Sequence, residues 1–216
     1  MDYGKSFTFV FEDEKWISKF VIGVLITLVP IVNFATYGYM VQLLKNVRDG
    51  EEYPLPEWDD FGKMFIDGLK FLVGALVYAL PIFLLSFVIM IFAIIAESGG
   101  AAETVFTGGI VLVSCLTLIF SLLILLVYPA LYIQYAKDDQ ISDMFRLGDM
   151  WDLFKANPAN YLIILLMIFF VVGFIASFGM IVCFVGIFFT AWWAQLVTAH
   201  MLGQLAKPQE KAATSF

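Results

Sequence analysis

Four aspartates are the side chains of this sequence best suited to bind a metal ion. Asp59 and Asp60 lie in "LPEWDDF", and Asp149 and Asp152 lie in "LGDMWDLFK". Carboxylate oxygens are the ligands that Mg²⁺ and Ca²⁺ prefer. Adjacent residues of a helix, however, point about 100° apart, so Asp59 and Asp60 cannot easily share one ion. The pattern therefore favours solvated carboxylates, and we predict no metal site.

The other reactive side chains do not form a pattern typical of an enzyme. His200 is the single histidine, whereas zinc and heme sites use several His or Cys ligands. Ser98 has an acid beside it but no base to activate it. The sequence has no Walker A loop, glycine-rich dinucleotide turn, H-E-x-x-H motif or basic patch for nucleic acid. We therefore predict a protein that is not an enzyme, with no catalytic residue, no cofactor and no nucleic-acid partner.

These residues must be positioned by an unusually apolar chain. Of its 216 residues, 62% are hydrophobic and 14% are charged, whereas soluble domains are about 45–50% apolar. A soluble fold of this size could not remove so much apolar surface from water. We predict an all-α fold, a polytopic transmembrane helical bundle that forms one integral membrane domain over residues 1–216. Cys115 and Cys183 fall within apolar runs and are expected to be free, buried thiols in lipid-facing or interhelical positions.

Four long uncharged runs define the predicted membrane segments: 20–44, 71–96, 105–136 and 161–205. A helix needs about 20 apolar residues to cross the hydrocarbon layer. The second and third runs are therefore one span each and form a two-span hairpin over 69–136. The fourth run is long enough for two spans, and Ser177, Phe178 and Gly179 permit a tight reversal within it. It predicts a second two-span hairpin over 161–205.

The first run, 20–44, allows two interpretations. It can cross once, which places the N-terminal lysines outside and opposes the positive-inside rule. It can instead form a short hairpin that turns at residues 29–33, where Pro30 breaks the helix and Asn33 suits a turn. The legs, of about 10 and 14 residues, would then be roughly 15 and 21 Å long. The chain thus has five to six membrane helices, and the side of the N-terminus depends on this choice.

Lysine and arginine residues predict the orientation of these helices. They concentrate in the polar segments 45–68, 137–160 and 206–216, whereas 97–104 contains neither. Basic loops stay on the cytoplasmic side of a membrane. We therefore expect a cytoplasmic loop with an interfacial helix at 45–68, a cytoplasmic interfacial helix at 137–160 and a cytoplasmic C-terminal tail at 206–216.

Three polar segments each carry a tryptophan flanked by acids before an apolar run, and the first is the N-terminal interfacial segment 1–19. In the second, Pro56 suits the first turn of a helix, and Asp67 falls on a polar side of it. An apolar stripe follows at helical spacing: Trp58, Phe61, Met64, Phe65 and Leu69. A helix with an apolar face, a charged face and a tryptophan belongs at the headgroup boundary. The predicted membrane-interface residues are Trp16, Trp58, Phe61, Phe65, Trp151 and Phe154.

Three apolar runs end with an aromatic residue followed shortly by a glutamine, at Gln42, Gln134 and Gln195. These side chains could converge as a polar ring at the cytoplasmic mouth of a bundle, but capping of helix ends is the favoured interpretation. The central parts of the predicted spans contain no Asp, Glu, Lys, Arg or His, the groups that pumps and proton-coupled carriers place there. Small residues four positions apart, such as Gly186 and Thr190, instead indicate close helix packing.

The stretch from residue 38 to 72 resembles a known family. It has Gly-Tyr before the loop, "NVRDG" as a helix stop, an "LPEWDD" box and a following Gly-Leu-Lys. In these features it is similar to the uncharacterised prokaryotic membrane proteins grouped as domain of unknown function 4013. The resemblance implies a multi-pass protein of the cytoplasmic (inner) membrane of a bacterium or archaeon. It brings no activity, cofactor or catalytic residue.

Three functions fit these observations. The favoured one is a non-enzymatic integral membrane scaffold or accessory subunit that packs against other membrane proteins or against itself, surrounded by membrane lipids. The alternative is a channel or carrier for an apolar or lipid-like substrate. A membrane enzyme that acts on lipid headgroups through the cytoplasmic carboxylates is the least favoured.

Overall fold

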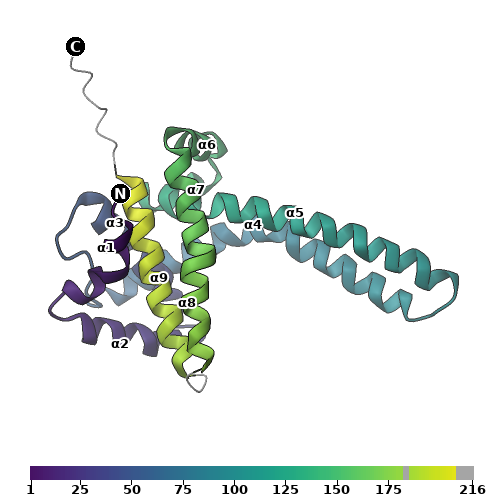
Figure 1. The fold of residues 1–216 in the computed structure, drawn as a ribbon, viewed down its shortest axis with the longest axis horizontal. Helices are drawn as coiled ribbons and strands as arrows, with labels where there is room; N and C mark the ends of the chain where they lie inside the picture. Colours follow the sequence, from purple (N-terminus) through teal and green to yellow (C-terminus); the bar gives the residue numbers. More distant parts are fainter. Residues whose placement is uncertain (182–184, 208–216) are drawn as a thin grey trace, which may run out of the picture. The chain divides into compact units, whose positions relative to one another are not determined.

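The computed structural model describes residues 1–181 and 185–207, and all regular structure in these ranges is helical (Figure 1). The chain divides into two compact units. The large unit contains Met1–Leu72 and Pro129–Phe216, and the hairpin unit contains Val73–Tyr128. The predicted all-α class is therefore confirmed.

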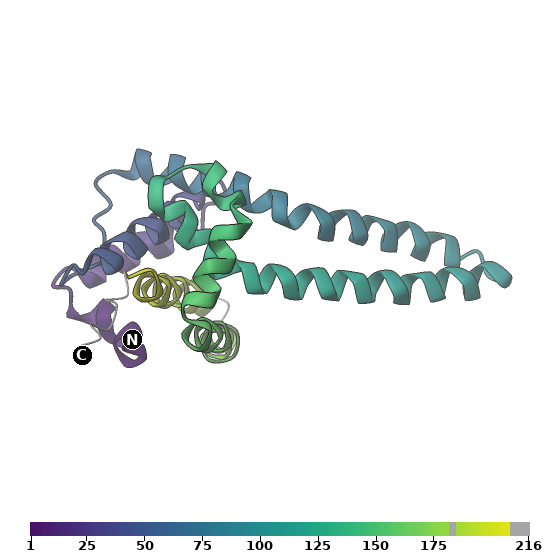
Figure 2. The ribbon, with the colours of Figure 1, turned by 90° about the horizontal axis from the view of Figure 1, so that it is seen from above.

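The hairpin unit is formed by the long helices α4, Phe61–Ala96, and α5, Ala101–Asp138, which lie side by side in both views (Figures 1 and 2). Gly99 and Gly100 join them with φ angles of 76° and 69°, a left-handed conformation that glycine adopts without strain. Within Val73–Tyr128 the only Asp, Glu, Lys, Arg or His residues are Glu97 and Glu103, at the tip. The body of this hairpin thus contains no charged side chain.

Among the residues that the structure describes, three helices are long and apolar enough to cross a membrane: Phe61–Ala96, Ala102–Asp138 and Pro158–Ser177. The sequence predicts five to six membrane helices. Two of the expected segments are short, because α2, Trp16–Thr27, has 12 residues and α3, Phe34–Asp49, has 16. At 1.5 Å per residue they reach about 18 and 24 Å, against about 30 Å of hydrocarbon.

The first apolar run is broken at the turn that the second of its two interpretations, the short hairpin, requires. Residues 28–33, with Pro30, separate α2 from α3, because proline cannot continue the hydrogen-bonding pattern of a helix. The helix stop at Gly50 is also confirmed. Gly50 has φ 84° and its backbone N–H donates to the carbonyls of Asn46 and Val47, which is the usual glycine C-cap.

Helix α4 begins at Phe61, so the prediction of a helix that starts near Pro56 is wrong. The segment 61–68 is the first part of the long helix rather than a separate interfacial one. Its buried face also differs from the predicted stripe. Phe61 and Leu69 are exposed, whereas Asp67, expected on a polar side, is only 9% exposed.

Two glycines explain which face of α4 turns inward. A Cβ on Gly38 of α3 would lie 1.9 Å from the Met64 carbonyl oxygen, and one on Gly68 of α4 would lie 1.8 Å from the Phe34 carbonyl oxygen. Only glycine permits this backbone-to-backbone approach. The α3–α4 crossing therefore buries the side of α4 that carries Asp67 and Gly68.

The rest of the large unit packs around α9, Val185–Ala206. The segments before it are α1 (Tyr3–Thr8), η1 (Phe9–Glu12), η2 (Ile141–Phe145), α6 (Leu147–Ala156), α7 (Pro158–Leu166), a π-helical turn η3 (Met167–Val172), α8 (Gly173–Ser177) and η4 (Phe178–Ile181). Helix α9 contacts α1, α2, α3, α7 and α8. Thr190 Oγ1 donates to the Ala176 carbonyl at 2.9 Å, and a Cβ on Gly179 would lie 2.2 Å from Thr190 Oγ1. The predicted close packing at Gly186 and Thr190 is therefore present.

Candidate functional site

The "YPLPEW" stretch is an anchored loop. The backbone carbonyls of three consecutive residues, Pro54, Leu55 and Pro56, each accept a hydrogen bond from a side chain of another segment. Asn46 Nδ2 donates to Pro54 O at 2.9 Å, Lys19 Nζ to Leu55 O at 2.8 Å, and Tyr39 Oη to Pro56 O at 2.9 Å. These bonds replace the helical ones, which explains why residues 54–57 do not form the predicted helix turn.

Lys19 joins the first two tryptophan-bearing segments. Its ammonium lies 2.7 Å from Asp13 Oδ2, with both side chains less than 10% exposed, and 3.3 Å from Glu57 Oε1. Trp58 Nε1 donates to the Lys19 carbonyl at 2.9 Å. A buried ion pair is costly to break from one side, because the remaining charge has no partner. Two acids beside these tryptophans, Asp13 and Glu57, are therefore partners of Lys19 within the large unit.

The tryptophan of this loop lies in an aromatic cluster. The Trp58 ring stacks on Tyr39 with centroids 4.3 Å apart and lies 5.9 Å from Trp192, which is fully buried. A Cβ on Gly23 would lie 2.2 Å from the Trp192 ring, so α2 also closes on this cluster. The half-buried Trp58 indole thus packs against Tyr39 and Trp192 of the same chain.

The other predicted interface residues are spread over the large unit. Trp16 is half-buried beside Phe11 and Phe20. The ring centroids of Phe65 and Phe34 are 6.2 Å apart. Trp151 is 54% exposed, stacks on Phe154 at 5.3 Å and carries the Lys155 ammonium 5.3 Å above its ring.

In the part of the chain that the structure describes, no hydrogen bond joins the three glutamines. Gln42 Nε2 donates to Asn46 Oδ1 at 2.8 Å. Gln134 is 1% exposed and neither of its amide atoms has a partner there. Gln195 Oε1 likewise has none.

The predicted aspartates do not gather at one place. Asp59, Asp60 and Asp67 line a cavity of about 370 Å³ beside Gln42, whereas Asp152 on α6 lies 3.9 Å from Lys155. Over residues 1–181 and 185–207, no three His, Cys, Asp or Glu side chains are placed to hold a metal ion. Cys115 is free and exposed on α5, so it is not buried between helices of this chain, and its lipid-facing position stays a prediction. Cys183 lies outside the described residues.

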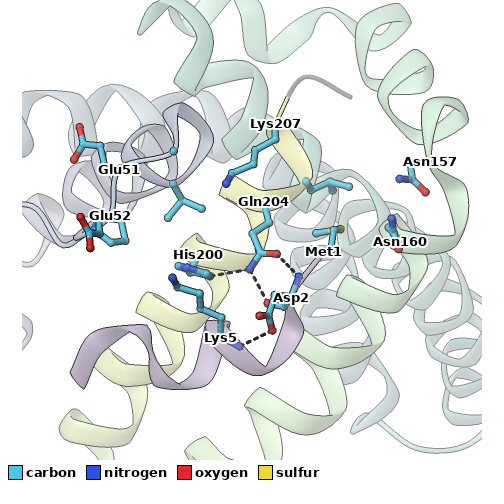
Figure 3. A pocket seen from close by; sticks show the side chains of 14 residues that line it. Met1, Asp2, Lys5, Glu51, Glu52, Asn157, Asn160, His200, Gln204 and Lys207 are labelled. Atoms are coloured by element: carbon cyan, nitrogen blue, oxygen red, sulfur yellow. Dashed lines mark hydrogen bonds between the residues drawn. The ribbon is translucent and has the colours of Figure 1, made fainter. Parts of the chain in front are cut away.

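A larger cavity, of about 860 Å³, lies between α1, α9, the first turn of α7 and the loop after α3 (Figure 3). We call it the α1–α9 cavity. Its polar lining includes Asp2, Lys5, Glu51, Glu52, Asn157, Asn160, His200, Gln204 and Lys207. Tyr3 Oη donates to Asn160 Oδ1 at 2.9 Å, which ties α1 to α7.

One glutamine docks α1 on α9. The Asp2 backbone N–H donates to Gln204 Oε1, and Gln204 Nε2 donates to the Asp2 carbonyl, both at 2.8 Å. Gln204 Nε2 also lies 3.1 Å from Ser6 Oγ and 3.2 Å from His200 Nδ1. Asp2 in turn caps α1, because its Oδ1 accepts from the Lys5 backbone N–H at 2.9 Å.

His200 is buried within this docking contact and lies outside the three helices that could cross a membrane. It is 3% exposed, its ring stacks on Phe9 at 4.2 Å, and its Nδ1 lies 2.9 Å from Ser6 Oγ. Burial lowers the pKa of its imidazole to about 4, and the nearby Lys5 and Lys207 add to this effect while Asp2 opposes it. His200 is therefore neutral at pH 7.

Sequence reasoning missed this cavity. One signal was present, since His200 and Gln204 lie four positions apart on one face of an otherwise apolar helix. The contribution of α1 to the cavity could not be predicted from spacing along one helix, because Ser6 and His200 are 194 positions apart in sequence.

Comparison with curated proteins and with solved structures gives no match. A family model does match, over residues 21–185, with the description "Protein of unknown function (DUF4013)". This range contains the "LPEWDD" box and the hairpin unit, but neither α1 nor the part of α9 with His200 and Gln204. Because the match covers most of the sequence, the chain belongs to the DUF4013 family, as its resemblance at residues 38–72 predicts.

Proposed function

We propose that this chain is a non-enzymatic scaffold or accessory subunit of a prokaryotic cytoplasmic membrane, which packs through its hairpin unit against helices of other membrane proteins or of a second copy. The observation that carries the proposal is an open glycine on α5. Apart from its chain neighbours and the adjacent backbone of α5, no atom lies within 4 Å of the position where a Cβ on Gly108 would be, whereas at the next residue, Gly109, that position is 2.6 Å from the ring of Phe92.

An open glycine is suited to contact with another helix. Lipid tails are as apolar as leucine side chains, so helices in a membrane associate where small residues let their backbones approach closely. Gly108 shares an exposed region of α5 with other small residues, Thr107, Ser114 and Cys115. Large exposed apolar residues such as Leu112 surround them, which supports insertion of a partner helix side chain over Gly108.

The alternative, a channel or carrier, finds less support. Thr117 and Ser121, the hydroxyl groups nearest the middle of α5, donate to carbonyls of their own helix at 2.9 and 2.8 Å. Gln134 is buried rather than open to a cavity. A polar route across the hairpin unit would need such groups to be available.

Extraction of the protein in native membrane nanodiscs, followed by native mass spectrometry, tests the proposal. We expect the chain together with a second membrane protein or a second copy. The variant Gly108→Leu should lower that associated fraction at least several-fold. Gly62→Leu is the matched control, because Gly62 also has open space around it but lies outside the hairpin unit. Recovery of the unmodified chain alone, as a monomer, would overturn the proposal.

A further inference from the structure

The α1–α9 cavity has the size of a ligand site. Its volume of about 860 Å³ falls within the range of about 300–1,000 Å³ that is common for small-molecule pockets. It is formed within the large unit by α1, α9, α7 and the loop after α3 (Figure 3). These are four separate segments, so the cavity is a product of the tertiary fold.

The contacts of His200 favour one of its two neutral tautomers. The backbone N–H and carbonyl of Asp2 fix which way the Gln204 amide points, so its Nε2 is the group near His200. The Gln204 amide nitrogen, at 3.2 Å, and the Ser6 hydroxyl, at 2.9 Å, are both able to donate to His200 Nδ1, which favours the tautomer in which Nδ1 accepts. The proton of the neutral ring is then on Nε2, and no hydrogen bond from Nε2 to any described residue is present. In this tautomer His200 offers an N–H donor at Nε2.

Charges of both signs surround that donor. Lys5, Lys207 and the Asp2 carboxylate, which caps α1, lie near His200, whereas Glu51 and Glu52 come from the opposite loop (Figure 3). Lys5 has an exposed partner, Glu12, at 3.6 Å, and an exposed pair of this kind contributes little and exchanges readily. A purely anionic ligand would be repelled by the glutamates, and a purely cationic one by the lysines. The lining therefore favours a zwitterion.

We propose that the α1–α9 cavity binds a phosphoethanolamine group, with its phosphate held by His200 Nε2–H, Lys5 and Lys207, and its ammonium by Glu51 and Glu52. A primary ammonium can donate hydrogen bonds to carboxylates, whereas the trimethylammonium of choline cannot. This chemistry has two sources, the headgroup of phosphatidylethanolamine and a soluble phosphoethanolamine ester. The proposal is independent of the scaffold role.

The test uses the full chain in nanodiscs of phosphatidylcholine, with and without phosphatidylethanolamine. Binding is measured by native mass spectrometry and by the shift of the thermal unfolding midpoint. Soluble glycerophosphoethanolamine and glycerophosphocholine are added in separate arms. We expect ethanolamine compounds to bind at least tenfold more tightly than choline compounds. Selective binding of the lipid assigns the membrane source, and selective binding of the ester alone assigns the soluble source.

Two double variants locate the site. Glu51→Gln with Glu52→Gln, and Lys5→Gln with Lys207→Gln, should each weaken binding at least tenfold. The matched controls are Asp59→Asn with Asp60→Asn and Lys63→Gln with Lys137→Gln, which make the same charge changes at exposed positions away from the cavity. All four should melt as the unmodified chain does in phosphatidylcholine alone. Equal binding of choline and ethanolamine compounds, binding of phosphatidylglycerol in place of both, or unchanged binding by the cavity variants would overturn the proposal.

Discussion

Lowering the pH from 7 to 4.5 should weaken the docking of α1 on α9, because His200 is held neutral in that contact. Its pKa is about 4 in the folded protein, against about 6.5 for an exposed histidine. Between these values the folded state binds fewer protons than the undocked state, so acid favours undocking. The contribution of His200 is fully present above pH 6.5 and is lost as the pH falls towards 4.

The expected size of this effect follows from the difference in pKa. One pH unit corresponds to about 1.36 kcal/mol. With pKa values of about 4 and 6.5, the docked state loses about 1.4 kcal/mol at pH 5.5 and about 2.6 kcal/mol at pH 4.5. The second value corresponds to a roughly 80-fold fall in the docking equilibrium.

Hydrogen exchange of the α1 backbone amides measures this docking equilibrium. Asn at position 200 is the control, because its Oδ1 can accept from the Gln204 amide as His200 Nδ1 does, but it does not titrate. After correction for the intrinsic pH dependence of exchange, the unmodified chain should lose protection relative to His200→Asn between pH 6.5 and 4.5. Parallel protection in the two proteins over this range would refute the reasoning.

Two further perturbations test the packing of the large unit. Gly38→Ala places a Cβ 1.9 Å from the Met64 carbonyl oxygen and should lower the free energy of unfolding, measured by denaturant titration, by about 1–3 kcal/mol. Gly62→Ala, where the Cβ enters open space, should leave it unchanged. Equal stability of the two variants would contradict the close α3–α4 crossing. Lys19→Met should cost about 3–5 kcal/mol, because Asp13 keeps a buried charge without a partner, and adding Asp13→Leu should recover much of that loss. A double variant no more stable than Lys19→Met alone would show that the ion pair is not the source of the effect.

Local signals in the sequence predict local structure well. Pro30 breaks the first apolar run and Gly50 ends α3, because backbone restrictions of these residues act whatever surrounds them. The long apolar hairpin is also predicted, since its hydropathy does not depend on neighbours. The tight packing at Gly186 and Thr190 is also predicted from local sequence, because small residues four positions apart on a helix allow another helix to approach closely.

The sequence-based predictions that are wrong concern residues whose conformation or burial depends on segments far away in the sequence. Pro56 suits a helix N-terminus, yet Tyr39 binds its carbonyl and holds the loop extended. The spacing of Asp67 predicts a position on the solvent-exposed face of α4, yet the close approach at Gly68 packs that face against α3. The α1–α9 cavity depends on Asp2 meeting Gln204 across the length of the chain, and no local pattern contains that pairing.

The central claim is that the hairpin unit lies among lipid tails, and the thiol of Cys115 tests it most directly. Cys115 is exposed on α5, 15 residues after Gly100 at the tip, which is about 22 Å along a helix. A spin label at Cys115 is measured in nanodiscs by electron paramagnetic resonance, with Cys183→Ser to remove the second thiol and Gly108→Leu to keep a partner helix off this region of α5. The account predicts fast relaxation by oxygen, which dissolves in the hydrocarbon, and weak relaxation by a water-soluble nickel chelate. Strong relaxation by the nickel chelate at Cys115 would contradict it.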